Sequence, residues 1–224
     1  VALVALCVVL GLGIGLAASL WGPRSRAQAP PSLPAGRVAT VVGGLVVVAL
    51  FAEWSGRAHS TLLYGMYGFD SLWYHMPFAA RFAQQESLTE LHFTSLALLS
   101  WFYPANSELF HTVGILTTGR DIASPFINLG WLGATLLAAW CLGRPWGVGP
   151  GAVAGAGVVL AAGVFADQAG EARNDIPATF FLLAAAAILA NAMSSRTQAH
   201  LPVATAPLAL AGVAAGLALG TKLN

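Results

Sequence analysis

Six long apolar stretches, each almost free of charged side chains, constrain what this chain can fold into. A helix needs about 20 mostly apolar residues to cross the hydrocarbon core of a membrane. An open strand would leave its edge without hydrogen-bond partners in lipid, so a helix is the expected form of each stretch. The sequence therefore predicts an all-α fold, a polytopic transmembrane helical bundle that forms one domain over residues 1–224. The six predicted spans are residues 1–21, 38–54, 122–142, 148–166, 176–193 and 206–221.

Composition favours a membrane protein and argues against several other classes. The chain is 57% apolar and 8% charged, whereas soluble domains carry about 25% charged residues. A net charge of +1 and the lack of a basic stripe predict no nucleic-acid partner. Cys7 and Cys141 both lie inside apolar stretches, which predicts neither a disulfide framework nor a metal cluster. Because the sequence opens at Val1 inside an apolar run, we expect it to be a fragment of a longer polytopic protein that contacts membrane lipids.

Arginines between the spans predict which helix ends face the cytoplasm. Five arginines lie in the segments on one side, whereas the short loop on the other side carries a single arginine, Arg173. By the positive-inside rule, the arginine-rich side is cytoplasmic. Residues 22–37 then form a cytoplasmic linker, and residues 55–121 form an outer loop that faces the periplasm or the cell exterior. The five arginines are Arg24, Arg26, Arg37, Arg144 and Arg196.

The acidic residues are confined to the predicted outer side. All nine fall between residues 53 and 121 or between residues 167 and 175. Acids contribute little to membrane orientation, so sorting during insertion does not account for this clustering. Two explanations stay open: the outer loops are simply the longest and wettest part of the chain, or they carry an outward-facing acidic site.

The long outer loop is predicted to contain amphipathic helices that lie along the membrane surface. Its segment SLWYHMPFAARFAQQ has apolar residues at helical spacing. A second segment, SLALLSWF, is too short to span, which fits an interfacial helix or a shallow re-entrant element. Asp70 and Ser71 stand at the start of the first helix and are predicted to cap it. The alternative for Asp70 is a chemical role at the mouth of the bundle, where a low dielectric strengthens the effect of a charge.

Further charged residues are predicted to lie at the same membrane level as Asp70. Glu171, Arg173 and Asp175 occupy the second outer loop, and Lys222 follows the last span at its outer end. Each has a simpler explanation as well. Asp175 would cap the fifth span, Arg173 would be a surface counter-ion, and Lys222 would extend from the helix end into the headgroup region.

Four motifs, taken in order, resemble membrane glycosyltransferases of the GT-C type. They are FDSLWYHMPFAARFAQQESL, FYPANSELFH, EARNDIPATFFLLA and AGLALGTKL, and the resemblance covers residues 38–224. Bacterial members related to protein mannosyltransferases and aminoarabinose transferases are the most similar. Two departures are visible. Many protein mannosyltransferases have two adjacent acids where this chain has Asp70 followed by Ser71, and an extra span precedes the usual first one.

The resemblance implies a hexosyl- or pentosyltransferase in a bacterial inner or plasma membrane, with its active site facing outward. The donor would be a sugar on a polyprenyl phosphate, and the acceptor a hydroxyl of a lipid, glycan or protein. Asp70 stands at the position of the catalytic base, and a single displacement would invert the anomeric carbon. Arg173 and Lys222 would stabilise the charge that develops on the leaving phosphate. Four further residues are expected to contact substrate: Tyr74, His75, Glu171 and Asp175.

Two other functions fit the same composition. A transporter or lipid flippase would place polar groups near the middle of the membrane on broken helices, and the nearest candidates are Pro125 and Asn128 at a span end. A non-catalytic assembly subunit would not require Asp70, Arg173 and Lys222 to converge. No cofactor is predicted and a divalent cation is not indicated, since no group of residues has metal-ligand spacing. Asp70 and Asp175 would share a cation only if the fold brought them together.

Overall fold

The computed structural model describes residues 36–88, 103–199 and 205–222, and the side chains of residues 195–199 are not described. Every regular element in these ranges is a helix, so the predicted all-α fold is confirmed. The first predicted span, most of the linker and the segment SLALLSWF lie outside the described residues. The elements are α2 (Arg37–Tyr64), η1 (Ser71–His75), α3 (Met76–Gln85), α4 (Asn106–Thr118), α5 (Ser124–Gly143), η3 (Arg144–Trp146), α6 (Gly149–Leu160), α7 (Gly163–Ala166), α8 (Asp175–Ala199) and α9 (Thr205–Thr221).

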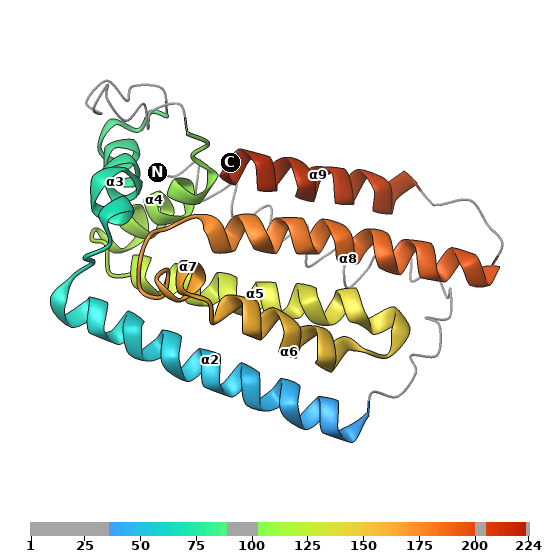
Figure 1. The fold of residues 1–224 in the computed structure, drawn as a ribbon. Coiled ribbons are helices and arrows are strands. Elements are labelled where there is room, and N and C mark those ends of the chain that lie inside the picture. The colour runs from blue at the N-terminus through green and yellow to red at the C-terminus, as the bar shows by residue number, and fades with distance from the viewer. Residues whose placement is uncertain (1–35, 89–102, 200–204, 223–224) are drawn as a thin grey trace.

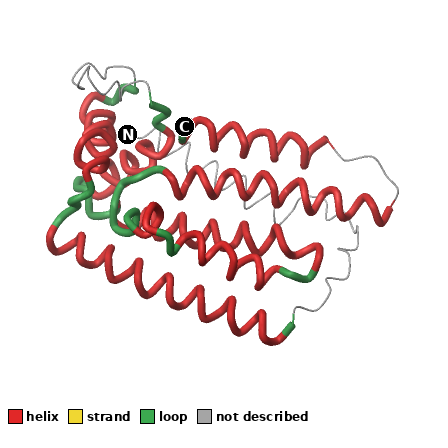
Figure 2. The backbone as a smooth tube through the Cα atoms, viewed as in Figure 1, coloured by secondary structure: helices red, strands yellow, loops and turns green. Residues whose placement is uncertain are grey.

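α2, α5, α6, α8 and α9 run side by side, and the shorter α3 and α4 pack together at one end (Figure 1). α8 contacts both α5 and α9, and α6 contacts both α5 and α2. α3 and α4 pack against each other at the end where α2 finishes and α8 begins. Loops also gather at this end, including the long connection between α6 and α8 (Figure 2). The fold therefore collects most of its irregular backbone in one place, which we call the loop end.

Three of the described helices are long and apolar enough to cross a membrane. They are Arg37–Tyr64, Ser124–Trp146 and Asp175–Ser194. α9 has 17 residues, which at a rise of about 1.5 Å each gives about 25 Å. The predicted fourth span at 148–166 differs more. α6 ends at Leu160, a turn follows, and α7 begins at Gly163, so no single helix covers that stretch.

α2 continues well beyond the predicted end of the second span at residue 54. It reaches Tyr64 and stops at Gly65, whose φ of 85° is a conformation that side-chain-bearing residues rarely adopt. An ion pair between Glu53 and Arg57, one turn apart, supports the additional length. The apolar stretch marks only the part of the helix that can lie in lipid, and the helix itself ends where the backbone is forced to turn.

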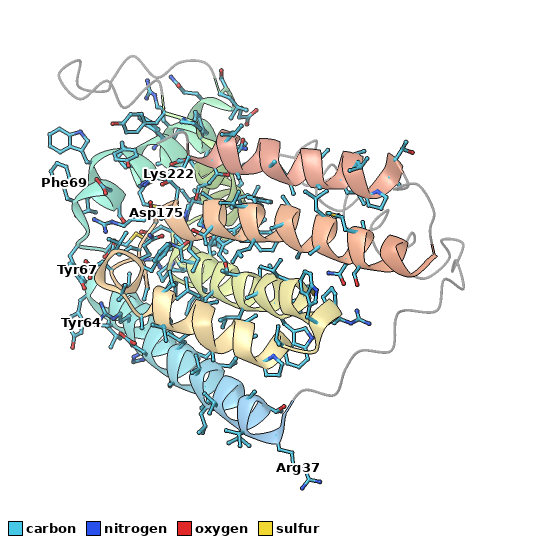
Figure 3. All side chains as sticks on the ribbon, turned by 45° about the vertical axis from the view of Figure 1, so that its right-hand side comes forward. Arg37, Tyr64, Tyr67, Phe69, Asp175 and Lys222 are labelled. Carbon is cyan, nitrogen blue, oxygen red and sulfur yellow. The ribbon has the colours of Figure 1, made fainter. Side chains whose placement is uncertain are left out.

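Residues that the arginine pattern assigned to opposite sides lie at opposite ends of the bundle. Figure 3 shows Arg37 at one end, and Asp175 and Lys222 close together at the loop end. The short turn at η3, which carries Arg144, lies at the end away from α3 and α4 (Figure 1). Which end faces the cytoplasm stays a prediction.

Close packing of α2 against α6 holds one edge of the bundle. A side chain added at Gly157 would collide with Val46 of α2, and one added at Gly43 would meet the carbonyl oxygen of Pro150. Small residues at such positions let helix backbones approach closely. A cluster of buried apolar residues fills the remaining space between the helices: Leu50, Trp54, Leu132, Leu136, Val153, Leu160, Ala169 and Ile176.

Candidate functional site

Asp70 lies in helical backbone at the start of η1 and does not act as a cap. Its φ of −63° and ψ of −39° are those of a helix, and its side chain makes no capping hydrogen bond. The prediction that Asp70 and Ser71 cap this helix is therefore wrong. Ser71 is fully buried, and its Oγ accepts a hydrogen bond from the N–H of Ala172 in the second outer loop. The turn from Ser71 to His75 is a π-helix, a wide helical form often found at functional sites.

The Asp70 carboxylate forms an ion pair with Arg173. The distance from Nη2 of Arg173 to Oδ2 of Asp70 is 3.3 Å, and the two side chains are 24% and 39% exposed. These residues are 103 positions apart and come from two different loops. The structure thus brings the expected base and one of the expected phosphate-binding cations into direct contact, at a place that solvent reaches.

A second ion pair joins Asp175 to Lys222 at the same end of the bundle. Asp175 is the first residue of α8, and its carboxylate also accepts a hydrogen bond from Nε2 of Gln168 at 2.8 Å. Asp175 is predicted to cap this helix. Its carboxylate instead contacts two other side chains, those of Lys222 and Gln168. A carboxylate here is favoured by the positive end of the helix dipole. Nearby, Nδ2 of Asn174 donates to the carbonyl of Thr221 at 2.9 Å, so the end of α9 is attached to the start of α8.

Asn128 of α5 holds the loop that carries Arg173 and Asp175. Its side chain is fully buried, and Nδ2 lies 3.2, 2.9 and 3.0 Å from the carbonyl oxygens of Gln168, Glu171 and Arg173. An amide group has two hydrogens, so the three carbonyls share two donors. From the sequence alone, Asn128 stands out only as a polar residue near a span end. The signal that could have identified it is a lone amide inside an otherwise apolar helix.

Glu171 joins the two outer loops from the inside. Its side chain is 2% exposed, and Oε1 accepts hydrogen bonds from the backbone N–H groups of Tyr67 and Gly68, both at 3.1 Å. A side chain at Gly68 would collide with this carboxylate, which explains a glycine at that position. The sequence predicts that Glu171 contacts substrate. Its carboxylate faces backbone, and a direct substrate contact would require these hydrogen bonds to break.

Tyr74 packs against the buried His75 and is close enough to Asp70 to be influenced by its charge. Its ring contacts His75, with centroids 4.1 Å apart, and meets Tyr103 edge-on at 5.5 Å. Burial raises the pKa of the Tyr74 phenol well above its usual value, and the nearby charge of Asp70 raises it further. The phenol is therefore protonated at neutral pH and can donate a hydrogen bond, as expected for a residue that lines a polar site.

His75 belongs to a buried polar cluster behind the site. It is 1% exposed and forms a hydrogen-bonded pair with Glu108 of α4. His111, one turn further along α4, is fully buried, and burial together with His75 lowers the pKa of His111 to about 3. Of the residues that the structure describes, no three or more histidines, cysteines or acids are arranged to hold a metal ion. His75 is predicted to contact substrate. It is buried, and its connection to the site is its contact with the ring of Tyr74.

An open hollow of about 440 Å³ is lined in part by residues that follow Asp70 closely in the sequence, the first of them Leu72. Its lining is mostly apolar, and Arg120 and Asp121 are the charged residues of that lining. Such a surface could accept an apolar chain that carries a polar group. Seven residues line it: Leu72, Met76, Pro77, Ala80, Ile115, Arg120 and Asp121.

Fold and composition together define a class: the described residues are all-α and include three helices that could cross a membrane, which indicates a multi-pass membrane protein. No protein-family model, curated protein or solved structure matches the chain.

Proposed function

We propose that this chain belongs to an integral-membrane glycosyltransferase of the GT-C type, which transfers a sugar from a polyprenyl phosphate to an acceptor hydroxyl. The observation that carries the proposal is the presence of two ion pairs, Asp70–Arg173 and Asp175–Lys222, at the same end of an apolar bundle. They come from three segments that are far apart in the sequence. An acid next to cations at the end of membrane helices is the combination that this reaction requires.

The chemistry assigns one task to each group. Asp70 accepts the proton of the acceptor hydroxyl while the oxygen attacks the anomeric carbon of the sugar. The bond between that carbon and the phosphate oxygen breaks, the phosphate leaves with the electron pair, and the configuration inverts. Arg173 and Lys222 stabilise the negative charge of the leaving phosphate.

A transporter or flippase has less support. That function calls for polar groups on broken helices near the middle of the membrane. The break between α6 and α7 lies next to the loop end, where residues 167–174 follow it. Asn191, a polar residue within α8, donates to the carbonyls of Cys141 and Ala187 at 2.8 Å and so serves helix packing. The contact between Asp70 and Arg173, at the same end of the bundle as Lys222, likewise favours an enzyme over a non-catalytic subunit.

Replacing Asp70 with Asn tests the proposal, because Asn keeps the size of the side chain and removes the base. The full-length protein would be reconstituted in lipid nanodiscs and assayed with a panel of polyprenyl-phosphate sugars. A positioned general base contributes about 10²- to 10⁴-fold to rate, so we expect Asp70→Asn to lower transfer by that factor.

Asp167→Asn is the matched control. Asp167 lies in the second outer loop, is exposed, and forms no ion pair in the part of the chain that the structure describes. Its variant should transfer sugar at the wild-type rate. Wild-type transfer by Asp70→Asn would refute the assignment of the base.

A further inference from the structure

Both cations of the proposed site are already bound to carboxylates. Arg173 is paired with Asp70, and Lys222 is paired with Asp175. The third acid, Glu171, contacts neither cation in these pairs, because its carboxylate accepts hydrogen bonds from the backbone N–H groups of Tyr67 and Gly68. A phosphate that binds Arg173 or Lys222 therefore competes with a carboxylate for that cation.

The loops do not depend on the ion pairs for their attachment. Glu171 binds the backbone after α2, and Ala172 donates to Ser71, next to Asp70 in the chain. Asn128 of α5 donates hydrogen bonds to backbone carbonyls of the same loop, and Asn174 donates to the carbonyl of Thr221 at the end of α9. All four of these anchors are buried. The charged side chains could therefore exchange partners while the backbone that carries them stays in place.

The ion pairs are also accessible, unlike the anchors. The four side chains are between 23% and 39% exposed. Exposed ion pairs are weak, usually below about 1 kcal/mol, whereas an arginine binds a phosphate through two parallel hydrogen bonds. An anionic phosphate therefore competes well with Asp70 for Arg173.

We propose that the resting ion pairs form an interlock, in which the phosphate of the donor displaces Asp70 from Arg173 and so frees the carboxylate for the acceptor. This inference rests on the proposed function and adds its regulation. Asp70 is held by Arg173 until a phosphate-bearing donor occupies the site. Lys222 exchanges Asp175 for the same phosphate. Donor binding then precedes productive acceptor binding.

Binding of farnesyl phosphate to the full-length protein in detergent micelles tests the interlock without any transfer reaction. If Asp70 competes with phosphate for Arg173, Asp70→Asn should bind the probe more tightly than the wild type. Loss of an exposed ion-pair competitor predicts a Kd about two- to fivefold lower. Arg173→Gln should weaken binding. Inorganic phosphate, titrated as a competitor, separates recognition of the phosphate group from recognition of the lipid chain.

Asp167→Asn is again the matched control, since it removes an acid from the loop that carries Arg173 without breaking an ion pair. Its Kd should not change, and an equal gain in affinity there would assign the effect to net charge and overturn the interlock. Unchanged or weaker binding by Asp70→Asn would overturn it as well. Asp175→Asn repeats the experiment at the second pair and decides the result if Asp70→Asn does not fold.

The interlock and the proposed base can fail separately. Tighter binding by Asp70→Asn together with wild-type transfer would keep the exchange and refute the base. Lost transfer with unchanged binding would keep the base and refute the exchange.

Discussion

Asn128→Leu should release the loop that carries Arg173 and Asp175. The substitution keeps a buried side chain of similar size in α5 and removes both amide hydrogens. Three carbonyl oxygens, those of Gln168, Glu171 and Arg173, lose their shared donor. Gln168 and Glu171 are buried, so water cannot easily replace it.

The expected loss of stability follows from that count of donors. A buried group left without its hydrogen-bond partner costs about 1–3 kcal/mol, and two hydrogens are removed. Part of the loss is offset because leucine is apolar and the site is surrounded by helices. We therefore expect Asn128→Leu to lower the free energy of unfolding by about 2–4 kcal/mol, and to increase hydrogen exchange at residues 168–174.

Thr135→Val, on the same helix, is the matched control. Thr135 is also fully buried, but its hydroxyl donates only to the carbonyl of Trp131 in its own helix. Its loss should cost about 1 kcal/mol or less and leave exchange at residues 168–174 unchanged. Unfolding in mixed micelles and hydrogen exchange measure both effects. Equal exchange at the loop in the two variants would refute the role assigned to Asn128.

Two further predictions concern the buried cluster and the α2–α6 contact. The pKa of His111 is lowered to about 3, and its unfolded value is about 6.5, so acid favours unfolding between those values and stability rises with pH by up to about 1.4 kcal/mol per unit. His111→Gln should flatten that slope in melting curves, whereas His59→Gln, at an exposed position, should not. Gly157→Leu should cost about 1–3 kcal/mol because Gly157 lies against Val46, whereas Gly155→Leu faces open space and should melt like the wild type.

The alternation of apolar stretches and polar loops was enough to predict which loops lie at the same end of the bundle. It placed Asp70, Arg173, Asp175 and Lys222 at one end of a helical bundle, because an even number of crossings separates these loops. It did not predict which acid pairs with which cation. Contacts such as Asp70–Arg173 join distant loops, and no spacing in the sequence encodes them.

Other differences have local physical causes. The apolar pattern ended the second span at residue 54, but α2 stops only at Gly65, where φ becomes positive. The fourth span looked continuous because Ala161 and Ala162 are apolar, yet the chain turns there between α6 and α7. His75 is predicted to contact substrate, but the structure buries it in a pair with Glu108 of α4. That contact joins residues 33 positions apart, and no spacing in the sequence encodes it.

The most direct test of the central claim is a structure of the full-length protein with a polyprenyl phosphate bound. We predict that the phosphate oxygens lie within about 3 Å of the Arg173 guanidinium and the Lys222 amine, with the Asp70 carboxylate released from Arg173 and facing the space where an acceptor hydroxyl would enter. A phosphate bound away from both cations, with the Asp70–Arg173 pair intact, would contradict the account.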